Sequence, residues 1–236
     1  MYLAEYTGKG VRVAVIDSGV HADHPHVGGV AGGIAIRDDG TLDDDFVDRL
    51  GHGTAVTAAI RDLAPDVEVV AIKVFWTSLA TNVNTLVRAM DEALARGATV
   101  LNLSLGTGDA RHRAALTAAV RRARASRAIV VSALDDAGAR WLPGDLDDVV
   151  PVELDWICSR DSYRIVRKHG RSVVAASGYP RGIPGVPPER NLKGISFAVA
   201  NASAFVARAL EAEPGGEIAA LFTRLGIEGL SACPLR

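Results

Sequence analysis

Short apolar runs alternate along the chain with longer amphipathic stretches. The short runs are rich in β-branched residues and are bounded by polar or glycine positions, which is typical of buried strands. They lie at residues 11–16, 67–73, 99–103, 128–132 and 148–152. We therefore predict a strand at each of these positions.

The stretches between these runs have the period of an α-helix. Between residues 82 and 96, apolar side chains recur at steps of three and four positions, and Gly97 follows as a helix stop signal. The alanine- and arginine-rich residues 109–125 predict a surface helix. Residues 196–210 predict another long helix, and residues 217–225 a short last one.

Strands that alternate with helices of this length form a parallel sheet covered by helices on both faces. The predicted fold is α/β, with three layers and a doubly wound, mostly parallel sheet. The acidic segment 38–48 and the glycine- and proline-rich segment 178–188 are interpreted as surface loops, so residues 1–236 are expected to form a single domain. In such sheets, catalytic and binding groups gather where the strands end.

Three polar residues stand out at such positions. Asp17 directly follows the first predicted strand, His52 lies between two glycines before an apolar stretch, and Ser196 begins the long predicted helix. Taken singly, each has an ordinary structural explanation: a turn, a satisfied histidine, a helix cap. A serine at a helix start can also be a nucleophile, because the helix dipole there favours a developing negative charge.

The order Asp, His, Ser, with each residue in a glycine-flanked motif, resembles that of the subtilisin-like serine proteases, the subtilase family. The resemblance covers nearly the whole chain and adds a subtilisin-like topology to the predicted fold. The motifs that carry it are Val15-Ile16-Asp17-Ser18-Gly19, Gly51-His52-Gly53-Thr54, Asn102-Leu103-Ser104-Leu105-Gly106 and Gly194-Ile195-Ser196-Phe197-Ala198.

The resemblance implies a serine endopeptidase that passes through an acyl-enzyme. Ser196 would attack the peptide carbonyl, His52 would carry the proton, and Asp17 would orient the imidazole. Residues Ser104, Leu105 and Gly106 would form one wall of the substrate cleft, along which an extended peptide binds as an added strand. The implied partner is a peptide or protein substrate, and no cofactor is implied.

Two positions depart from the family pattern close to this site. Asp136 falls where the family has an asparagine that donates to the oxyanion, and an ionised carboxylate can only accept hydrogen bonds. We expect a working enzyme in which Asp136 faces the oxyanion. The chain looks shortened between Gly138 and Pro143, and Trp141 falls where a specificity pocket would have its floor. A bulky ring there would leave a shallow pocket, unless Trp141 packs elsewhere.

The calcium loop that many subtilases insert after the histidine-bearing helix is absent from this sequence. We therefore predict no strong metal site of that type. The acidic residues of segment 38–48 could hold an ion, but a solvated loop is the expected structure.

Composition sets limits on the class of protein. Of 236 residues, 48% are hydrophobic and 23% charged, with a net charge of −2, which argues against wholesale disorder and against a nucleic-acid or anionic-membrane binder. No uninterrupted run of about 18 apolar residues occurs.

The chain opens without a signal-peptide pattern or a pro-segment, and Cys158 and Cys233 are expected to be reduced thiols. These features predict a cytoplasmic protein with a narrow processing role, such as trimming a leader from a peptide precursor.

Two other functions compete with this one. The changes at Asp136 and at Ala200-Asn201, where the family has Pro-His, motivate a catalytically impaired subtilase fold that binds peptides. The segment His21-Ala22-Asp23-His24-Pro25-His26 motivates a metallohydrolase, because imidazoles and a carboxylate lie within six residues.

Overall fold

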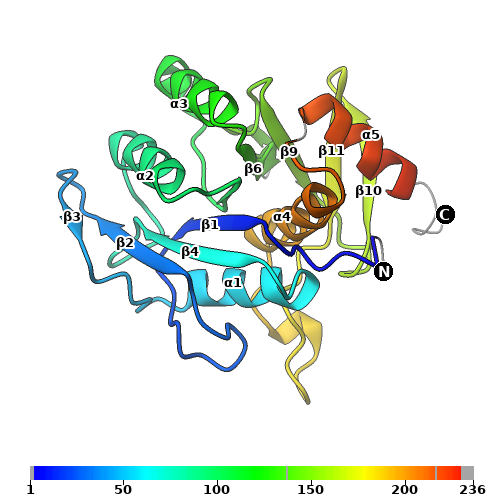
Figure 1. Cartoon of the computed structure of the whole chain (residues 1–236), viewed down its shortest axis with the longest axis horizontal. Helices are drawn as coiled ribbons and strands as arrows, with labels where there is room; N and C mark the ends of the chain where they lie inside the picture. The colour runs from blue at the N-terminus through cyan, green and yellow to red at the C-terminus, as the bar shows by residue number, and fades with distance from the viewer. Residues whose placement is uncertain (1–2, 137, 216, 230–236) are drawn as a thin grey trace.

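The computed structural model describes residues 3–136, 138–215 and 217–229. Its centre is a nine-stranded sheet in the order β10-β11-β9-β6-β5-β1-β4-β2-β3 (Figure 1). All neighbours from β11 to β2 are parallel, whereas β3 and β10 pair antiparallel at the two edges. The strands are β1 Arg12–Asp17, β2 Gly32–Ile36, β3 Leu42–Asp43, β4 Glu68–Lys73, β5 Val100–Leu103, β6 Ile129–Ala133, β9 Val149–Leu154, β10 Tyr163–Lys168 and β11 Arg171–Ala176.

The strands predicted from the apolar runs correspond to β1, β4, β5, β6 and β9. Each is almost wholly buried, because helices cover both sides of it. The prediction missed β2, β3, β10 and β11. The sequence of β10 mixes arginine and lysine with apolar residues, and its position at the sheet edge explains why charged side chains are tolerated there.

The 3.6-residue period predicts four of the five described helices, all but His52–Leu63. In the helix Val83–Ala95, the Asn82 side chain accepts a hydrogen bond from the Thr85 backbone N–H at 2.9 Å, and Gly97 follows the helix end with a left-handed φ of 73°. The structure has α1 His52–Leu63, α2 Val83–Ala95, α3 Arg113–Ala125, α4 Ile195–Ala212 and α5 Ile218–Gly229, with short 3-10 turns at Ala110–His112 and Pro188–Arg190.

The helices divide between the two faces of the sheet (Figure 1). Alternate side chains of β1 point to opposite faces: Val13 and Val15 pack with α1, α4 and α5, whereas Ala14 and Ile16 pack with α2 and α3. This arrangement confirms the three-layer, mostly parallel, doubly wound fold.

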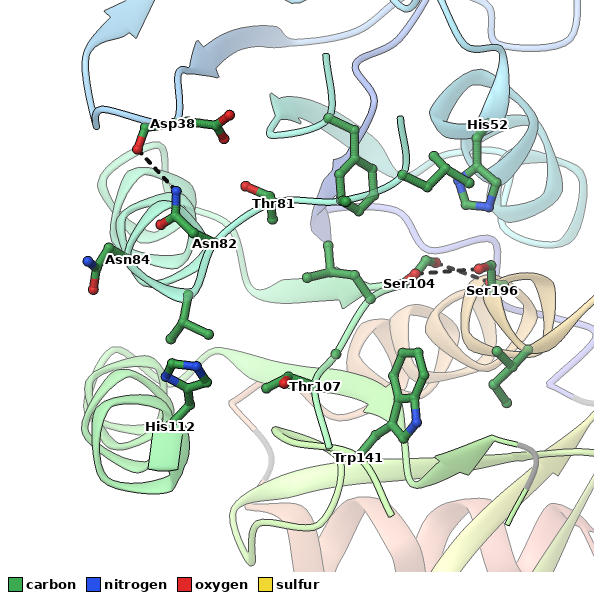
Figure 2. A pocket seen from close by; sticks show the side chains of 17 residues that line it. Asp38, His52, Thr81, Asn82, Asn84, Ser104, Thr107, His112, Trp141 and Ser196 are labelled. Atoms are coloured by element: carbon green, nitrogen blue, oxygen red, sulfur yellow. Dashed lines mark hydrogen bonds between the residues drawn. The ribbon is translucent and has the colours of Figure 1, made fainter. Parts of the chain in front are cut away.

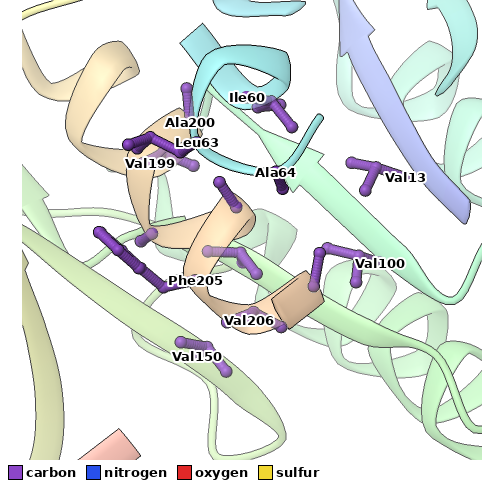
Figure 3. Packing of buried hydrophobic residues seen from close by; sticks show 14 of the residues in the cluster. Val13, Ile60, Leu63, Ala64, Val100, Val150, Val199, Ala200, Phe205 and Val206 are labelled. Carbon is purple, nitrogen blue, oxygen red and sulfur yellow. The ribbon is translucent and has the colours of Figure 1, made fainter. Parts of the chain in front are cut away.

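Helix α4 forms the middle of one of these two cores. Its apolar side chains meet α1 on one side and the sheet on the other, as Figure 3 shows for Val199, Phe205 and Val206. Of the residues described, α4 alone has the length and composition of a membrane-crossing helix, yet 78% of it is buried within the protein. The central helix of a core passes the same test, and packing accounts for its apolar character.

The two predicted loops need a partial correction. Segment 178–188 is irregular, as expected, but the acidic segment 38–48 contains the short strand β3 and ends in a buried carboxylate, that of Asp48. The prediction of a wholly solvated acidic loop is therefore wrong for Asp48, because hydrogen-bond donors from two other segments surround it. Cys158 is buried, and Cys233 lies outside the described residues.

Candidate active site

The candidate site begins at the end of β1. This strand lies between β4 and β5, at the point where the order of parallel strands reverses, and such a point opens a crevice at the carboxyl ends. Asp17 is the last residue of β1 and is fully buried. Its Oδ1 atom accepts a hydrogen bond from the backbone N–H of Ser18 at 2.7 Å.

His52 is the first residue of α1, and two glycines allow that helix to approach β1. Gly51 has a left-handed φ of 82° at the helix start. A Cβ atom on Gly53 would lie 2.2 Å from the Gly19 carbonyl oxygen and 3.2 Å from the Asp17 side chain. Only glycine permits this close approach, which brings the His52 ring onto Asp17.

A short hydrogen bond joins the two side chains. Nδ1 of His52 lies 2.8 Å from Oδ1 and 3.0 Å from Oδ2 of Asp17, and the His52 side chain is 15% exposed. Burial lowers the pKa of His52, but the hydrogen bond and charge of Asp17, with the charge of Asp48, outweigh it, so that the net pKa is raised. The imidazole is thus oriented, with Nε2 as the nitrogen left to exchange a proton.

Ser196 enters the site from the opposite side of the cleft, as the second residue of α4. The N-cap of this helix is Gly194, with φ 146°, and its N–H donates to the Gly178 carbonyl at 2.9 Å. Within the described residues no acceptor pairs with the Ser196 N–H. This N–H therefore remains available at the positive end of the helix dipole, where an anionic oxygen would be stabilised.

The Ser196 hydroxyl is held by Ser104. Ser196 Oγ lies 3.4 Å from the Ser104 carbonyl oxygen, and Ser104 Oγ donates to the Ser196 carbonyl at 3.1 Å. Among the residues that the structure describes, no hydrogen bond joins Ser196 to His52. Both side chains line the same cleft, and such bonds often tighten only when substrate is present. A rotation about the Ser196 Cα–Cβ bond changes where the hydroxyl points.

The cleft has a volume of about 690 Å³ (Figure 2). His52, Ser104 and Ser196 lie at one end, and Asp38, Asn82, Asn84 and His112 at the other. The predicted wall residues Ser104, Leu105 and Gly106 all line it.

Trp141 lines the same cleft, and its place as the floor of a specificity pocket stays a prediction. A Cβ atom on Gly106 would lie 2.8 Å from Cε3 of the Trp141 ring, which therefore rests on the Gly106 backbone. The neighbouring residues Thr107 and Leu142 form an antiparallel bridge with backbone hydrogen bonds of 2.9 and 2.8 Å. This bridge fixes the backbone next to the ring and limits how far the ring can move.

Asp136 lies in the short hairpin of β7 Asp135–Asp136 and β8 Ala139–Arg140, opposite Ala139. Its side chain lies outside the part of the chain that the structure describes. The role of Asp136 at the oxyanion stays a prediction.

The histidine-rich segment does not gather a metal-binding set. Within the described residues, no group of three His, Cys, Asp or Glu side chains is arranged to hold a metal ion. The ring centroids of His24 and His26 lie 5.1 Å apart, and those of His21 and His24 lie 6.5 Å apart. The geometry gives no support to the metallohydrolase alternative.

Comparison with known proteins identifies the family. Residues 8–146 match the model of the subtilase family. The chain belongs to the subtilase family. The matched range includes Asp17, His52 and the Ser104–Gly106 wall but ends before Ser196, whose place in the site is given by the geometry of α4.

Individual subtilases agree with this assignment. The chain is 31% identical over 211 residues to subtilisin-like protease SBT6.1 of Arabidopsis thaliana, an alignment that covers 81% of this chain and 20% of that protein. The chain thus spans about a fifth of that relative's length. A cold-adapted subtilisin-like serine proteinase has a similar structure, with a TM-score of 0.72 at 24% identity over 94% of this chain and 83% of that one. A lanthipeptide protease matches with a TM-score of 0.71 at 21% identity, over 99% and 84% of the two chains.

The contacts that the sequence did not reveal are those behind the site. Asp48 and Ser18 join the start of α1 to the end of β1, and Asn102 links Ser104 to Ser203 of α4. The sequence rule for helix caps does not find Asp48, because that rule concerns the residue directly before the helix, which is Gly51.

Proposed function

We propose that this subtilase is a serine endopeptidase whose catalytic residues are Asp17, His52 and Ser196. The observation that carries the proposal is the 2.8 Å bond between His52 Nδ1 and buried Asp17 beside a cleft that Ser196 also lines. An oriented imidazole and a serine at a helix start are the parts that acyl transfer needs.

In the proposed reaction, Ser196 Oγ attacks the peptide carbonyl carbon while His52 Nε2 takes the hydroxyl proton. Asp17 stabilises the resulting imidazolium, and the Ser196 N–H donates to the oxyanion. The carbon–nitrogen bond then breaks, the amine leaves with the proton from His52, and Ser196 carries an acyl group. Water, deprotonated by His52, attacks this ester, releases the acid and restores the serine.

The cleft supports a preference for small residues at the amino side of the cut bond. A peptide added as a strand along Ser104–Gly106 would place the side chain of that residue next to the Trp141 ring. The ring occupies space that a large side chain would need. We therefore propose that glycine, alanine or serine is preferred at this position.

Processing of a peptide precursor in the cytoplasm is the proposed role. A ring that limits the size of the bound side chain suits an enzyme that cuts few sites. One protein with this fold is described as a lanthipeptide protease, which motivates precursor peptides as the first substrates to test.

The test is mass spectrometry of a peptide mixture incubated with wild type, Ser196→Ala and the control Ser126→Ala, which alters an exposed serine at the end of α3. We expect wild type and the control to cut the same bonds and Ser196→Ala to lose about 10⁶-fold in rate. A fluorophosphonate probe should label wild type and the control but not Ser196→Ala. Absence of both cleavage and labelling in wild type would favour the alternative function, an impaired peptide-binding subtilase.

Trp141→Ala tests the preference for small residues, with the exposed Trp156→Ala as control. The cavity left by the ring should improve cleavage after leucine or phenylalanine relative to alanine by at least about 10- to 200-fold, the range for a single methylene in an apolar pocket. A peptide library with every residue at that position measures the ratio. The same ratio in Trp141→Ala and wild type would contradict the proposed place of the ring.

A further inference from the structure

We propose that Asp48 is a positioning residue for the triad: its carboxylate holds the first turn of α1 against the end of β1 and thereby keeps His52 on Asp17. The inference rests on the proposed function, because it assigns a part in that function to a residue outside the three catalytic ones. It starts from the hydrogen bonds that converge on this one buried side chain.

Both carboxylate oxygens of Asp48 are used. Oδ2 accepts from the backbone N–H of Thr54 at 2.9 Å and from its hydroxyl at 2.7 Å. Oδ1 accepts from the backbone N–H groups of Leu50 and Gly51 at 2.9 and 2.8 Å. Asp48 therefore satisfies donors at the start of α1 that have no partner within the helix, on both sides of His52.

A further hydrogen bond connects Asp48 to the end of β1, next to Asp17. Ser18 donates its hydroxyl hydrogen to Asp48 Oδ1 at 2.8 Å, and Ser18 Oγ accepts from the Gly53 N–H at 2.9 Å. Ser18 follows Asp17 directly and binds its Oδ1 through the backbone N–H at 2.7 Å. Ser18, the residue after Asp17, thus contacts both Asp48 and Gly53, the residue after His52.

The segment that carries Asp48 is anchored as well. The preceding residue, Val47, accepts a hydrogen bond through its carbonyl from Nζ of buried Lys73 at 2.6 Å. Lys73 is the last residue of β4 and pairs in register with Asp17 of β1. The carboxylate is therefore held in place by the same two strands that hold Asp17.

Electrostatics provides a readout that simple packing would not change. Burial opposes ionisation of Asp48, but the bonds from Thr54, Ser18 and Gly51 outweigh it and hold its pKa below the ordinary value. Asp48 is therefore ionised at neutral pH. The charged groups that act on His52 are Asp17 from β1 and Asp48 from the segment before α1, and both raise the pKa of His52.

The experiment compares wild type with Asp48→Asn and with Asp44→Asn, which removes the same charge from an exposed position four residues earlier. Asp48→Asn should lower kcat by about 10²-fold, the cost of displacing a catalytic group by about 1 Å, with KM changed less than twofold. The acidic limb of its kcat/KM profile should move to lower pH, because His52 loses a neighbouring negative charge. Asp44→Asn should match wild type in both.

The proposal would be overturned if folded Asp48→Asn had the kcat of wild type and the acidic limb of its kcat/KM profile lay at the same pH. If Asp48→Asn does not fold, Ser18→Ala is used, which removes only the bridging hydroxyl. It should lower kcat several-fold and leave KM unchanged, and a wild-type kcat would overturn the proposal.

An NMR titration of the His52 ring separates this proposal from the proposed function. The ring should titrate at lower pH in Asp48→Asn even if wild type cleaves no peptide, and an unchanged midpoint counts against the Asp48 proposal alone.

Discussion

The Asp17–His52 half of the site and the Ser196 half differ in how their side chains are fixed. Asp17 is fully buried, and its carboxylate binds both the His52 ring and the Ser18 N–H. Among the residues that the structure describes, the Ser196 hydroxyl has a single hydrogen bond, of 3.4 Å, to the Ser104 carbonyl. The proposed acid–base pair is thus organised before any substrate arrives, whereas the hydroxyl of the proposed nucleophile is held by one long contact.

This difference suggests where substrate acts. A peptide that binds along Ser104–Gly106 would present backbone N–H groups to the carbonyl that the Ser196 hydroxyl now uses. Competition for the Ser104 carbonyl would then release the hydroxyl toward His52.

After the loss of Ser196 itself, removing the negative charge of Asp17 should have the largest effect. Asp17→Asn should lower kcat by about 10⁴-fold, because an amide that donates to Nδ1 leaves the imidazole in the wrong tautomer. Asp23→Asn, the same change at an exposed carboxylate, is the control. Steady-state kinetics on one cleavable peptide measures both variants, and a loss below tenfold in Asp17→Asn would show that the pair is not the acid–base centre.

The rate of attack by Ser196 should rise when residue 136 can donate a hydrogen bond to the oxyanion. Asp136→Asn should raise kcat by about 10²-fold, because an amide donates where an ionised carboxylate repels. Asp135→Asn is the matched control, since its carboxylate pairs with Lys168 at 2.7 Å and points to another partner. Equal rates in wild type and Asp136→Asn at every pH would remove Asp136 from the oxyanion.

The pH dependence of kcat/KM should report the pKa of His52. The raised pKa of His52 means that the imidazolium persists above 6.5, its ordinary value, and an imidazolium cannot accept the serine proton. The kcat/KM of wild type should therefore fall about tenfold for each pH unit below a midpoint that lies above 6.5. A midpoint below 6.5 would mean that burial outweighs the two carboxylates.

The smallest effect is expected from removing the hydrogen bond between the Ser104 hydroxyl and the Ser196 carbonyl. Ser104→Ala removes the hydroxyl that donates to the Ser196 carbonyl at 3.1 Å and accepts from Asn102. The loss of about 1 kcal/mol of hydrogen bonding should lower kcat about fivefold. Ser78→Ala, at an exposed position, is the control. A fall as large as that of Asp17→Asn would show that the nucleophile depends on this bond as strongly as the base depends on Asp17.

Much of this fold could be read from the sequence, because buried parallel strands are short apolar runs and the helices between them keep a regular period. The central strands and the order Asp17, His52, Ser196 follow from local patterns of this kind. The outer strands β2, β3, β10 and β11 did not follow. At the edge, for example, β10 carries Arg164, Arg167 and Lys168, because one side of that strand lacks a neighbour.

The burial of polar side chains could not be predicted from local sequence patterns. Asp48 ends an acidic run, and composition favours water around it. Its burial depends on Ser18, which lies 30 positions earlier, and on Thr54 in the next helix. The contact of Trp141 with Gly106 likewise depends on the bridge between Thr107 and Leu142, which only the folded chain brings together.

The location of Ser196 on α4 has a consequence for how such an enzyme would age in solution. Helix α4 is the middle of one of the two cores, so a molecule whose core has opened enough to be digested has also displaced its proposed nucleophile. Self-digestion would require an intact copy to attack an opened one. Inactivation on storage should therefore accelerate with protein concentration, and dilution should prolong the working life of the enzyme.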